Sequence, residues 1–158
     1  MRRAAAAPVV GCMIGPFSLA GRIFGVSEAL EATALEPKTV LALLEKVTEF
    51  QLAYARAFRE TGITGIIVAE PAAGLLSPAA LGRFSAPFVK HIVEGTQTKD
   101  FAVIYHNCGA KLIHLDKILE SGTEIYHFGA PMDIVAALER VTGQVIIGGN
   151  LDPAGFFH

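Results

Sequence analysis

The segment FAVIYHNCGAKLIHLDKILESGTEIYHFG, residues 101–129, decides the fold because it predicts a strand, a helix and another strand in succession. Its apolar start, Phe101–Tyr105, indicates a buried strand. Leu112–Leu119 indicates a helix that stops at Ser121-Gly122, and Glu124–Tyr126 indicates a short strand. Strands that are continuous apolar runs and alternate with helices are typical of a parallel sheet covered on both faces.

The same alternation continues on both sides of this segment. The further predicted elements are a strand at 8–14, a helix at 37–60, a strand at 63–69, two short helices between 77 and 95, a helix at 131–141 and a strand at 144–147. Pro37 suits the first turn of the long helix, and Thr61-Gly62 ends it. Ser77-Pro78 caps the first short helix, and Pro87 separates it from the second.

Two parallel architectures fit this order, an open doubly wound sheet and a (β/α)8 barrel. A phosphate-binding fingerprint after the first strand would favour the open sheet, but GCMIGPFSLAG at 11–21 lacks the GxGxxG order. A complete barrel typically needs about 250 residues and eight strands. The sequence therefore predicts an α/β fold and, if the sheet is a barrel, a partial (β/α)8 TIM-type barrel with about five parallel strands.

Composition and charge limit the function classes. The chain has 158 residues, 52% hydrophobic and 18% charged, which indicates one domain buried on more than one side or against a partner. A net charge of −2 gives no electrostatic reason to expect nucleic acid or an anionic membrane as partner. The two cysteines are too few for a disulfide framework, so a cytoplasmic location is expected. The apolar stretch before Cys12 is too short for a signal peptide, and no run approaches the roughly 20 residues of a membrane span.

Polar residues follow the predicted strands at the points where parallel sheets gather their chemistry. Glu70 follows the second strand, His106 and Cys108 the third, His127 the fourth and Asn150 the fifth. We expect these side chains to line one concave face, with Cys12 apart from them as a small core residue. Each of them alone also has a structural explanation: Glu70 could cap a helix, His127 could be a hydrogen-bonded core residue, and Cys108 could act as a small hydrophobe. The other histidines, His91, His114 and His158, are expected to be structural, surface or terminal residues.

His106 and Cys108 form the more specific pair, because residues i and i+2 of an extended segment point the same way. An imidazole and a thiolate in this arrangement can reach one ion, and zinc accepts N and S ligands at about 2.0–2.3 Å. A catalytic zinc site uses three protein ligands and leaves one position open, so two ligands alone do not make a site.

The chain resembles the uroporphyrinogen decarboxylase superfamily over nearly its whole length. The residues that carry the resemblance, in order, are GPFSLAGRIFG at 15–25, EPAAGLLSP at 70–78, YHNCG at 105–109, YHFG at 126–129 and GGNLDPAG at 148–155. Family members fold as a (β/α)8 barrel. The resemblance implies that residues 1–158 correspond to the middle and later part of that barrel, without its N-terminal strands and its C-terminal end.

Within this superfamily the chain is more similar to the corrinoid-linked branch, the methylcobamide:coenzyme M methyltransferases. Decarboxylases typically have a tyrosine at the position of Arg22 and an Asp-Ser pair at the position of Glu70-Pro71, and this sequence departs at both. The methyltransferase branch binds zinc with His-x-Cys and a distant cysteine. His106 and Cys108 match the first two ligands, and the third is not in this chain.

The resemblance implies zinc-dependent methyl transfer from a methylated corrinoid protein or free methylcobamide to a thiol such as coenzyme M, or to another acceptor. Glu70, His127 and Asn150 are the further catalytic candidates, and the chain alone is expected to be inactive. The first alternative is a uroporphyrinogen decarboxylase of porphyrin and heme biosynthesis, which needs no metal. The second is a catalytically inactive barrel fragment. Because unpaired strand edges recruit partners, we also expect a homo-oligomer.

Overall fold

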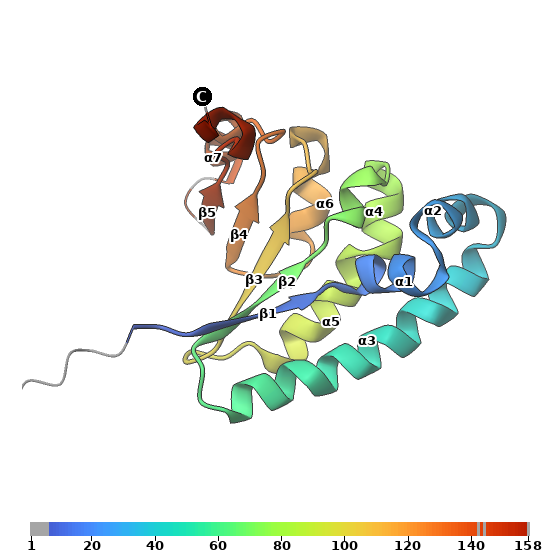
Figure 1. Ribbon diagram of the computed structural model, residues 1–158, viewed down its shortest axis with the longest axis horizontal. Helices are drawn as coiled ribbons and strands as arrows, with labels where there is room; N and C mark the ends of the chain where they lie inside the picture. Colours follow the sequence, from blue (N-terminus) through green and yellow to red (C-terminus); the bar gives the residue numbers. More distant parts are fainter. Residues whose placement is uncertain (1–6, 142, 144, 158) are drawn as a thin grey trace, which may run out of the picture.

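Five parallel strands form one sheet in the order in which they occur along the chain. They are β1 (Val10–Ile14), β2 (Gly65–Ala69), β3 (Ala102–Asn107), β4 (Ile125–Phe128) and β5 (Ile146–Gly149). The computed structural model in Figure 1 describes residues 7–157 except 142 and 144. A doubly wound sheet would reverse its strand order at a switch point, whereas a barrel adds strands in sequence. The observed order is that of a barrel, which confirms the predicted α/β fold with five parallel strands.

Helices connect the strands. The α-helices are α1 (Pro16–Phe24), α2 (Val26–Leu35), α3 (Pro37–Glu60), α4 (Pro78–Phe84), α5 (Ala86–Thr96), α6 (Leu115–Leu119) and α7 (Ile134–Val141), and the 3-10 helices are η1 (Ala72–Leu75), η2 (Leu112–His114) and η3 (Pro153–Phe157). The long helix has the predicted bounds, and Ser77 caps α4 by accepting a hydrogen bond from the Ala80 amide at 3.2 Å. No helix among the described residues combines the length and the apolar character that a membrane span requires.

Helices α1 and α2 were not assigned from the sequence. Pro16 begins α1, and Gly25, with a φ of 100°, separates the two helices in a conformation that favours glycine. Helix α7 begins at Ile134 rather than at Pro131, because Asp133 accepts a hydrogen bond from the Ala136 amide and so marks its first turn.

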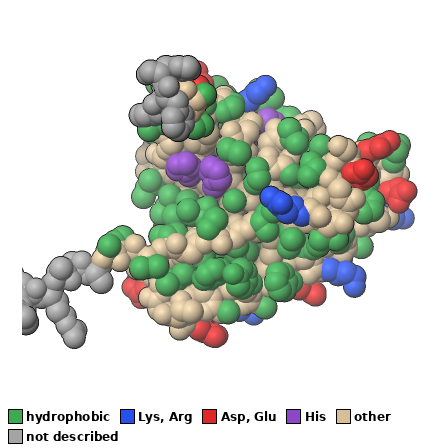
Figure 2. Space-filling view, in the orientation of Figure 1, with side chains coloured by type: hydrophobic (Ala, Val, Ile, Leu, Met, Phe, Trp, Pro, Cys, Tyr) green, Lys and Arg blue, Asp and Glu red, His purple; other side chains and the backbone are tan. Residues whose placement is uncertain are grey.

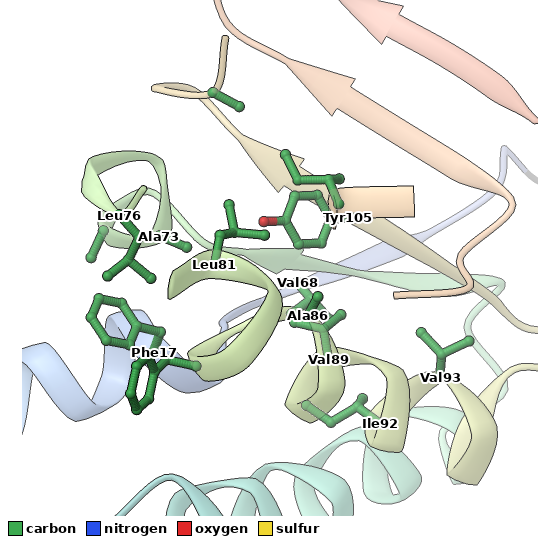
Figure 3. Close-up of a cluster of buried hydrophobic side chains, with 14 of the residues drawn as sticks. Phe17, Val68, Ala73, Leu76, Leu81, Ala86, Val89, Ile92, Val93 and Tyr105 are labelled. Atoms are coloured by element: carbon green, nitrogen blue, oxygen red, sulfur yellow. The ribbon is translucent and has the colours of Figure 1, made fainter. Parts of the chain in front are cut away.

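The hydrophobic core lies between the sheet and its helices (Figure 3). Val68 of β2 and Tyr105 of β3 point toward this layer, where they meet Leu81 of α4 and Val89 of α5. All four side chains are fully buried. Burying each aliphatic side chain of this size contributes about 1.5–3 kcal/mol, so this layer is the main source of stability.

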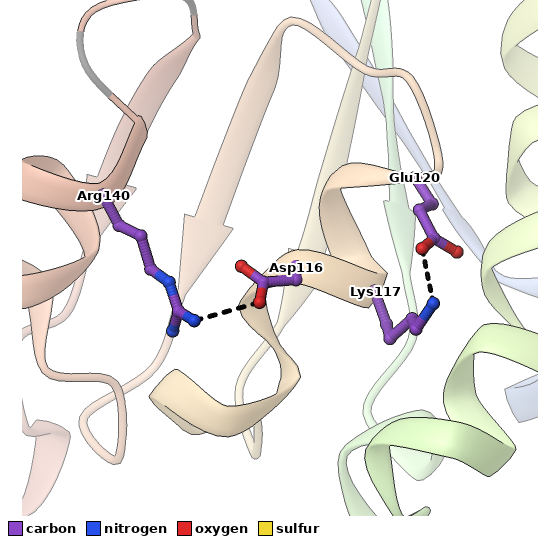
Figure 4. Close-up of polar contacts among 4 residues, drawn as sticks. All are labelled: Asp116, Lys117, Glu120 and Arg140. Atoms are coloured by element: carbon purple, nitrogen blue, oxygen red, sulfur yellow. Dashed lines mark hydrogen bonds and ion pairs between the residues drawn. The ribbon is translucent and has the colours of Figure 1, made fainter.

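Ion pairs add little to this stability. Figure 4 shows Arg140 of α7 bound to Asp116 of α6 at 3.0 Å, and Lys117 bound to Glu120 at 2.6 Å. All four side chains are largely exposed, and such pairs contribute about 0–1 kcal/mol each. The Arg140 contact links α7 to α6 across the surface and contributes little to the stability of the fold.

The opposite face of the sheet is open among the described residues, which corrects the expectation that both faces are covered. The register aligns Cys12, Ile67, Ile104, Ile125 and Ile146 in one row across this face. Cys12 is exposed, Ile146 is 62% exposed, and the three central isoleucines are half-buried. Hydrophobic side chains are conspicuous on the face turned to the viewer in Figure 2. In a closed barrel this face is the interior, so the continuous apolar runs reflect barrel geometry rather than a second layer of helices.

Candidate functional site

A second row of residues crosses the open face nearer the carboxyl ends of the strands. The register places Ile14, Ala69, His106, His127 and Gly148 side by side, one from each strand. The two imidazoles are therefore neighbours on β3 and β4, and each has a small residue on its other side. Figure 2 shows two adjacent histidine side chains surrounded largely by hydrophobic ones. This row places nitrogen ligands at the end of the sheet where barrels carry their chemistry.

The two histidines contact each other directly. Nδ1 of His106 lies 2.9 Å from Nδ1 of His127 and 3.2 Å from the backbone carbonyl oxygen of His127. The ring centroids are 5.0 Å apart, with 46° between the ring planes. Burial, and then the nearby charge of His127, lower the pKa of His106 below its ordinary value of 6.5. His106 is therefore a neutral imidazole at neutral pH, the form that binds metals.

Cys108 shares a hollow with both histidines. The hollow has a volume of about 660 Å³, and its other lining residues are Phe128, Gly129, Ala130, Pro131, Gly149, Leu151 and Pro153. Cys108 is exposed in the turn after β3. Gly129 is required here, because a Cβ on it would lie only 2.8 Å from the Cα of Cys108. His106 and Cys108 therefore open into the same space.

Asn107, which lies between these two residues, was missed by the sequence reasoning. It is fully buried; its side-chain amide donates to the Tyr105 hydroxyl at 3.3 Å and its Oδ1 accepts from the Gly109 amide at 3.0 Å. The second bond shapes the turn that carries Cys108. A polar residue with strong turn preference between two candidate ligands was the signal in the sequence.

Cys12 is not the separate core residue that was expected. It is exposed on the edge strand β1 and lines a second, apolar hollow of about 420 Å³, together with His106, His127 and the isoleucine row. The expectation was wrong because the Cys12 side chain points to the open face, which the helices do not cover.

Glu70 does not line the concave face with the histidines. Its carboxylate is completely buried and accepts hydrogen bonds from the Phe17 amide at 2.9 Å, the Ser18 amide at 3.0 Å and the Ser18 hydroxyl at 2.8 Å. Burial raises the pKa of Glu70 to about 7, although these hydrogen bonds oppose the shift. A Cβ on Gly15 would lie 2.6 Å from the carboxylate. Glu70 thus holds the N-terminus of α1, which is the helix-cap alternative, and its expected placement was wrong.

Asn150, His91 and His114 are not among the residues that line the hollow containing Cys108. The side-chain amide of Asn150 donates to the Met132 carbonyl at 2.6 Å, which ties the segment after β5 to the loop after β4. His114 is buried and bonds the Lys111 amide at 3.0 Å and the Leu76 carbonyl at 3.1 Å, which confirms its structural assignment. His91 is exposed on α5, and His158 lies outside the described residues.

The metal-ligand set is incomplete in the described part of the chain. His106 and Cys108 offer the nitrogen and sulfur that zinc takes. No group of three or more His, Cys, Asp or Glu side chains among residues 7–157, apart from 142 and 144, is placed to hold one ion. The nitrogen and sulfur donors are of the types that zinc binds, but two donors are fewer than the three that a catalytic zinc site uses.

Comparison with known proteins identifies the family of this chain. A profile of the uroporphyrinogen decarboxylase (URO-D) family matches residues 1–157, and the chain belongs to this family. The structure matches a solved methyltransferase from Methanosarcina mazei with a TM-score of 0.80 and 21% identity, over 94% of this chain and 44% of that one. The likeness shows the fold, and the five strands form part of a family barrel.

The individual relatives include enzymes with two different activities. The chain is 32% identical over 149 residues to a methylcobamide:CoM methyltransferase of Methanosarcina acetivorans, which covers 92% of this chain and 43% of that protein. Identity to the same enzyme of Methanosarcina mazei is 33% with the same coverage. Identity to a uroporphyrinogen decarboxylase of Geobacter sp. (strain M21) is 26% over 160 residues, 98% of this chain and 47% of that protein. The chain spans less than half the length of each of these relatives.

Proposed function

We propose that this chain supplies two of the three zinc ligands of a corrinoid-dependent methyltransferase, whose acceptor is a thiol such as coenzyme M. The observation that carries the proposal is that His106 and Cys108 open into one hollow at the carboxyl end of the sheet. Its support from the comparisons is the higher identity to methylcobamide:CoM methyltransferases, 32–33%, than the 26% to the Geobacter decarboxylase.

His106 and Cys108 would hold the ion, and a third ligand has to come from outside the described residues. When bound, zinc lowers the pKa of a coordinated thiol so that it reacts as a thiolate. The small side chains of Ala69 and Gly148 leave space beside the histidines, and the adjacent row with Ile67 and Ile104 makes the neighbouring surface apolar. In the proposed reaction the methyl group would come from the corrinoid.

The chain alone is expected to transfer no methyl group, because two ligands do not hold the ion. The test uses a chimera in which residues 1–158 replace the matching segment of the Methanosarcina mazei methyltransferase. It should transfer methyl groups from methylcobalamin to coenzyme M, and Cys108→Ala should abolish this transfer. Cys12→Ala is the matched control, because Cys12 also lies on the open face but in the other row.

Two other outcomes identify the alternatives. Decarboxylation of uroporphyrinogen that survives Cys108→Ala would assign the metal-free decarboxylase activity. Loss of every activity in a folded chimera would assign an inactive family fragment. In both cases the methyltransferase proposal would be wrong.

The open face also supports assembly into a homo-oligomer. Strands β1 and β5 are the free edges of the sheet, and Val10 and Ile146 on them are 42% and 62% exposed. Exposed edges beside apolar side chains recruit further chains.

A further inference from the structure

The hydrogen bonds between His106 and His127 determine where the proton of His106 lies. A backbone carbonyl oxygen can only accept, so the 3.2 Å contact from Nδ1 of His106 to the His127 carbonyl requires a hydrogen on that Nδ1. The same hydrogen points toward Nδ1 of His127, 2.9 Å away, which then acts as a second acceptor. A neutral imidazole carries one ring hydrogen, so Nε2 of His106 keeps a free lone pair.

We propose that His127 is a positioning residue, which fixes His106 as its Nδ1–H tautomer and presents Nε2 to the metal. This proposal deepens the proposed function and rests on it. Histidines that bind metals almost always donate their other ring N–H to a carbonyl, carboxylate or water, and this bond orients the ring. His127 supplies such acceptors from both its backbone and its side chain.

A direct role of His127 as a ligand through Nδ1 fits the geometry less well. Two nitrogens on one tetrahedral zinc, each about 2.0–2.1 Å from it, lie about 3.3 Å apart. The observed 2.9 Å is the usual length of a hydrogen bond. If Nδ1 of His106 bound a metal, it could no longer donate its hydrogen bond to the His127 carbonyl oxygen.

Among the described residues, no charged or carboxamide side chain that lines the hollows around His106 competes with His127 for this ring. The described residues that line the two hollows around it include no Asp, Glu, Lys, Arg, Asn or Gln. The neighbours of the pair in the same row are Ala69 and Gly148, which offer no polar side chain. His127 is therefore the one residue in these hollows that can both orient the ring and set its tautomer.

The experiment measures long-range ¹H–¹⁵N correlations of ¹⁵N-histidine in the metal-free chain at about pH 8, where imidazoles of ordinary pKa are neutral. A His106→Gln variant assigns the signal. The wild type should show protonated Nδ1 and free Nε2 on His106. His127→Ala keeps the backbone carbonyl at 3.2 Å but removes the shorter contact, 2.9 Å, to the side chain, so it should weaken the preference and give a mixture of tautomers. His127→Asn should restore the wild-type pattern because its Oδ1 can replace the Nδ1 acceptor.

Two results would overturn the proposal: an Nε2–H tautomer in the wild type, or the same His106 spectrum in His127→Ala as in the wild type. Cobalt(II) titration of the chimera with the Methanosarcina mazei methyltransferase gives a second readout, in which His127→Ala weakens binding about tenfold and His127→Asn recovers it. The tautomer is read without metal or corrinoid. Failure of methyl transfer would therefore leave this result intact, and the two proposals fail separately.

Discussion

Replacing Glu70 with glutamine should remove a pH dependence of folding stability that follows from the burial of this carboxyl group. The pKa of Glu70 is about 7 in the folded chain, against an ordinary value of 4.5. The folded chain therefore holds the proton to higher pH than the unfolded chain does. The stabilisation is fully present below about pH 4.5 and is lost as the pH rises through 7. At about 1.4 kcal/mol for each pKa unit, the total is roughly 3.5 kcal/mol.

Urea denaturation at several pH values measures this effect. About 2.5 kcal/mol of the wild-type free energy of unfolding should be lost between pH 5 and pH 8, beyond any loss in Glu70→Gln. All other ionisable groups are the same in both proteins, so their contributions cancel in the difference. At pH 5 the variant should be less stable by about 1–3 kcal/mol, because its amide N–H group faces the Ser18 donors. The exposed Glu94→Gln is the control and should keep the wild-type slope. Equal slopes for wild type and Glu70→Gln would refute the reasoning.

Three further predictions concern packing and assembly. Leu81→Ala should lower the free energy of unfolding by about 2–5 kcal/mol in urea denaturation. Leu75→Ala, at a side chain that is 65% exposed, should change it by less than about 0.5 kcal/mol. Equal effects of the two substitutions would contradict the assigned core. Gly129→Ala should lower the free energy of unfolding by about 1–3 kcal/mol in the same assay, because the new Cβ meets the backbone of Cys108. An unchanged denaturation midpoint would show that this turn is not tightly packed. Light scattering after size-exclusion chromatography should show an oligomer that Ile146→Lys weakens, and a wild-type monomer at high concentration would exclude the assembly.

The fold could be predicted from the sequence to the extent that strong local signals mark its elements. The helix 37–60 was predicted with its observed bounds, because a proline starts it and Thr61-Gly62 ends it. Helices α1 and α2 were missed, since Gly25 and the surrounding small residues interrupt any long helical pattern. The open face was missed for another reason: an apolar run has the same appearance whether its second face packs on helices or lines a barrel.

Candidate site residues could be predicted as a group but not all as individuals. The rule that parallel strands end at one rim brought His106, Cys108 and His127 into one hollow. It failed for Glu70 because side chains alternate along a strand and its continuation. Ala69 shares a row with His106 on the open face, so the next residue, Glu70, points to the helices. Counting this alternation from the apolar residues would have separated Glu70 from the histidines.

The zinc content after dialysis against zinc-free buffer tests the central claim most directly. The account predicts less than stoichiometric zinc on the 158-residue chain, because His106 and Cys108 are two ligands of a site that needs three. It predicts about one zinc on the chimera with the Methanosarcina mazei methyltransferase, lost in Cys108→Ala and retained in Cys12→Ala. Stoichiometric, tightly held zinc on the short chain, or zinc that persists in the Cys108→Ala chimera, would contradict it.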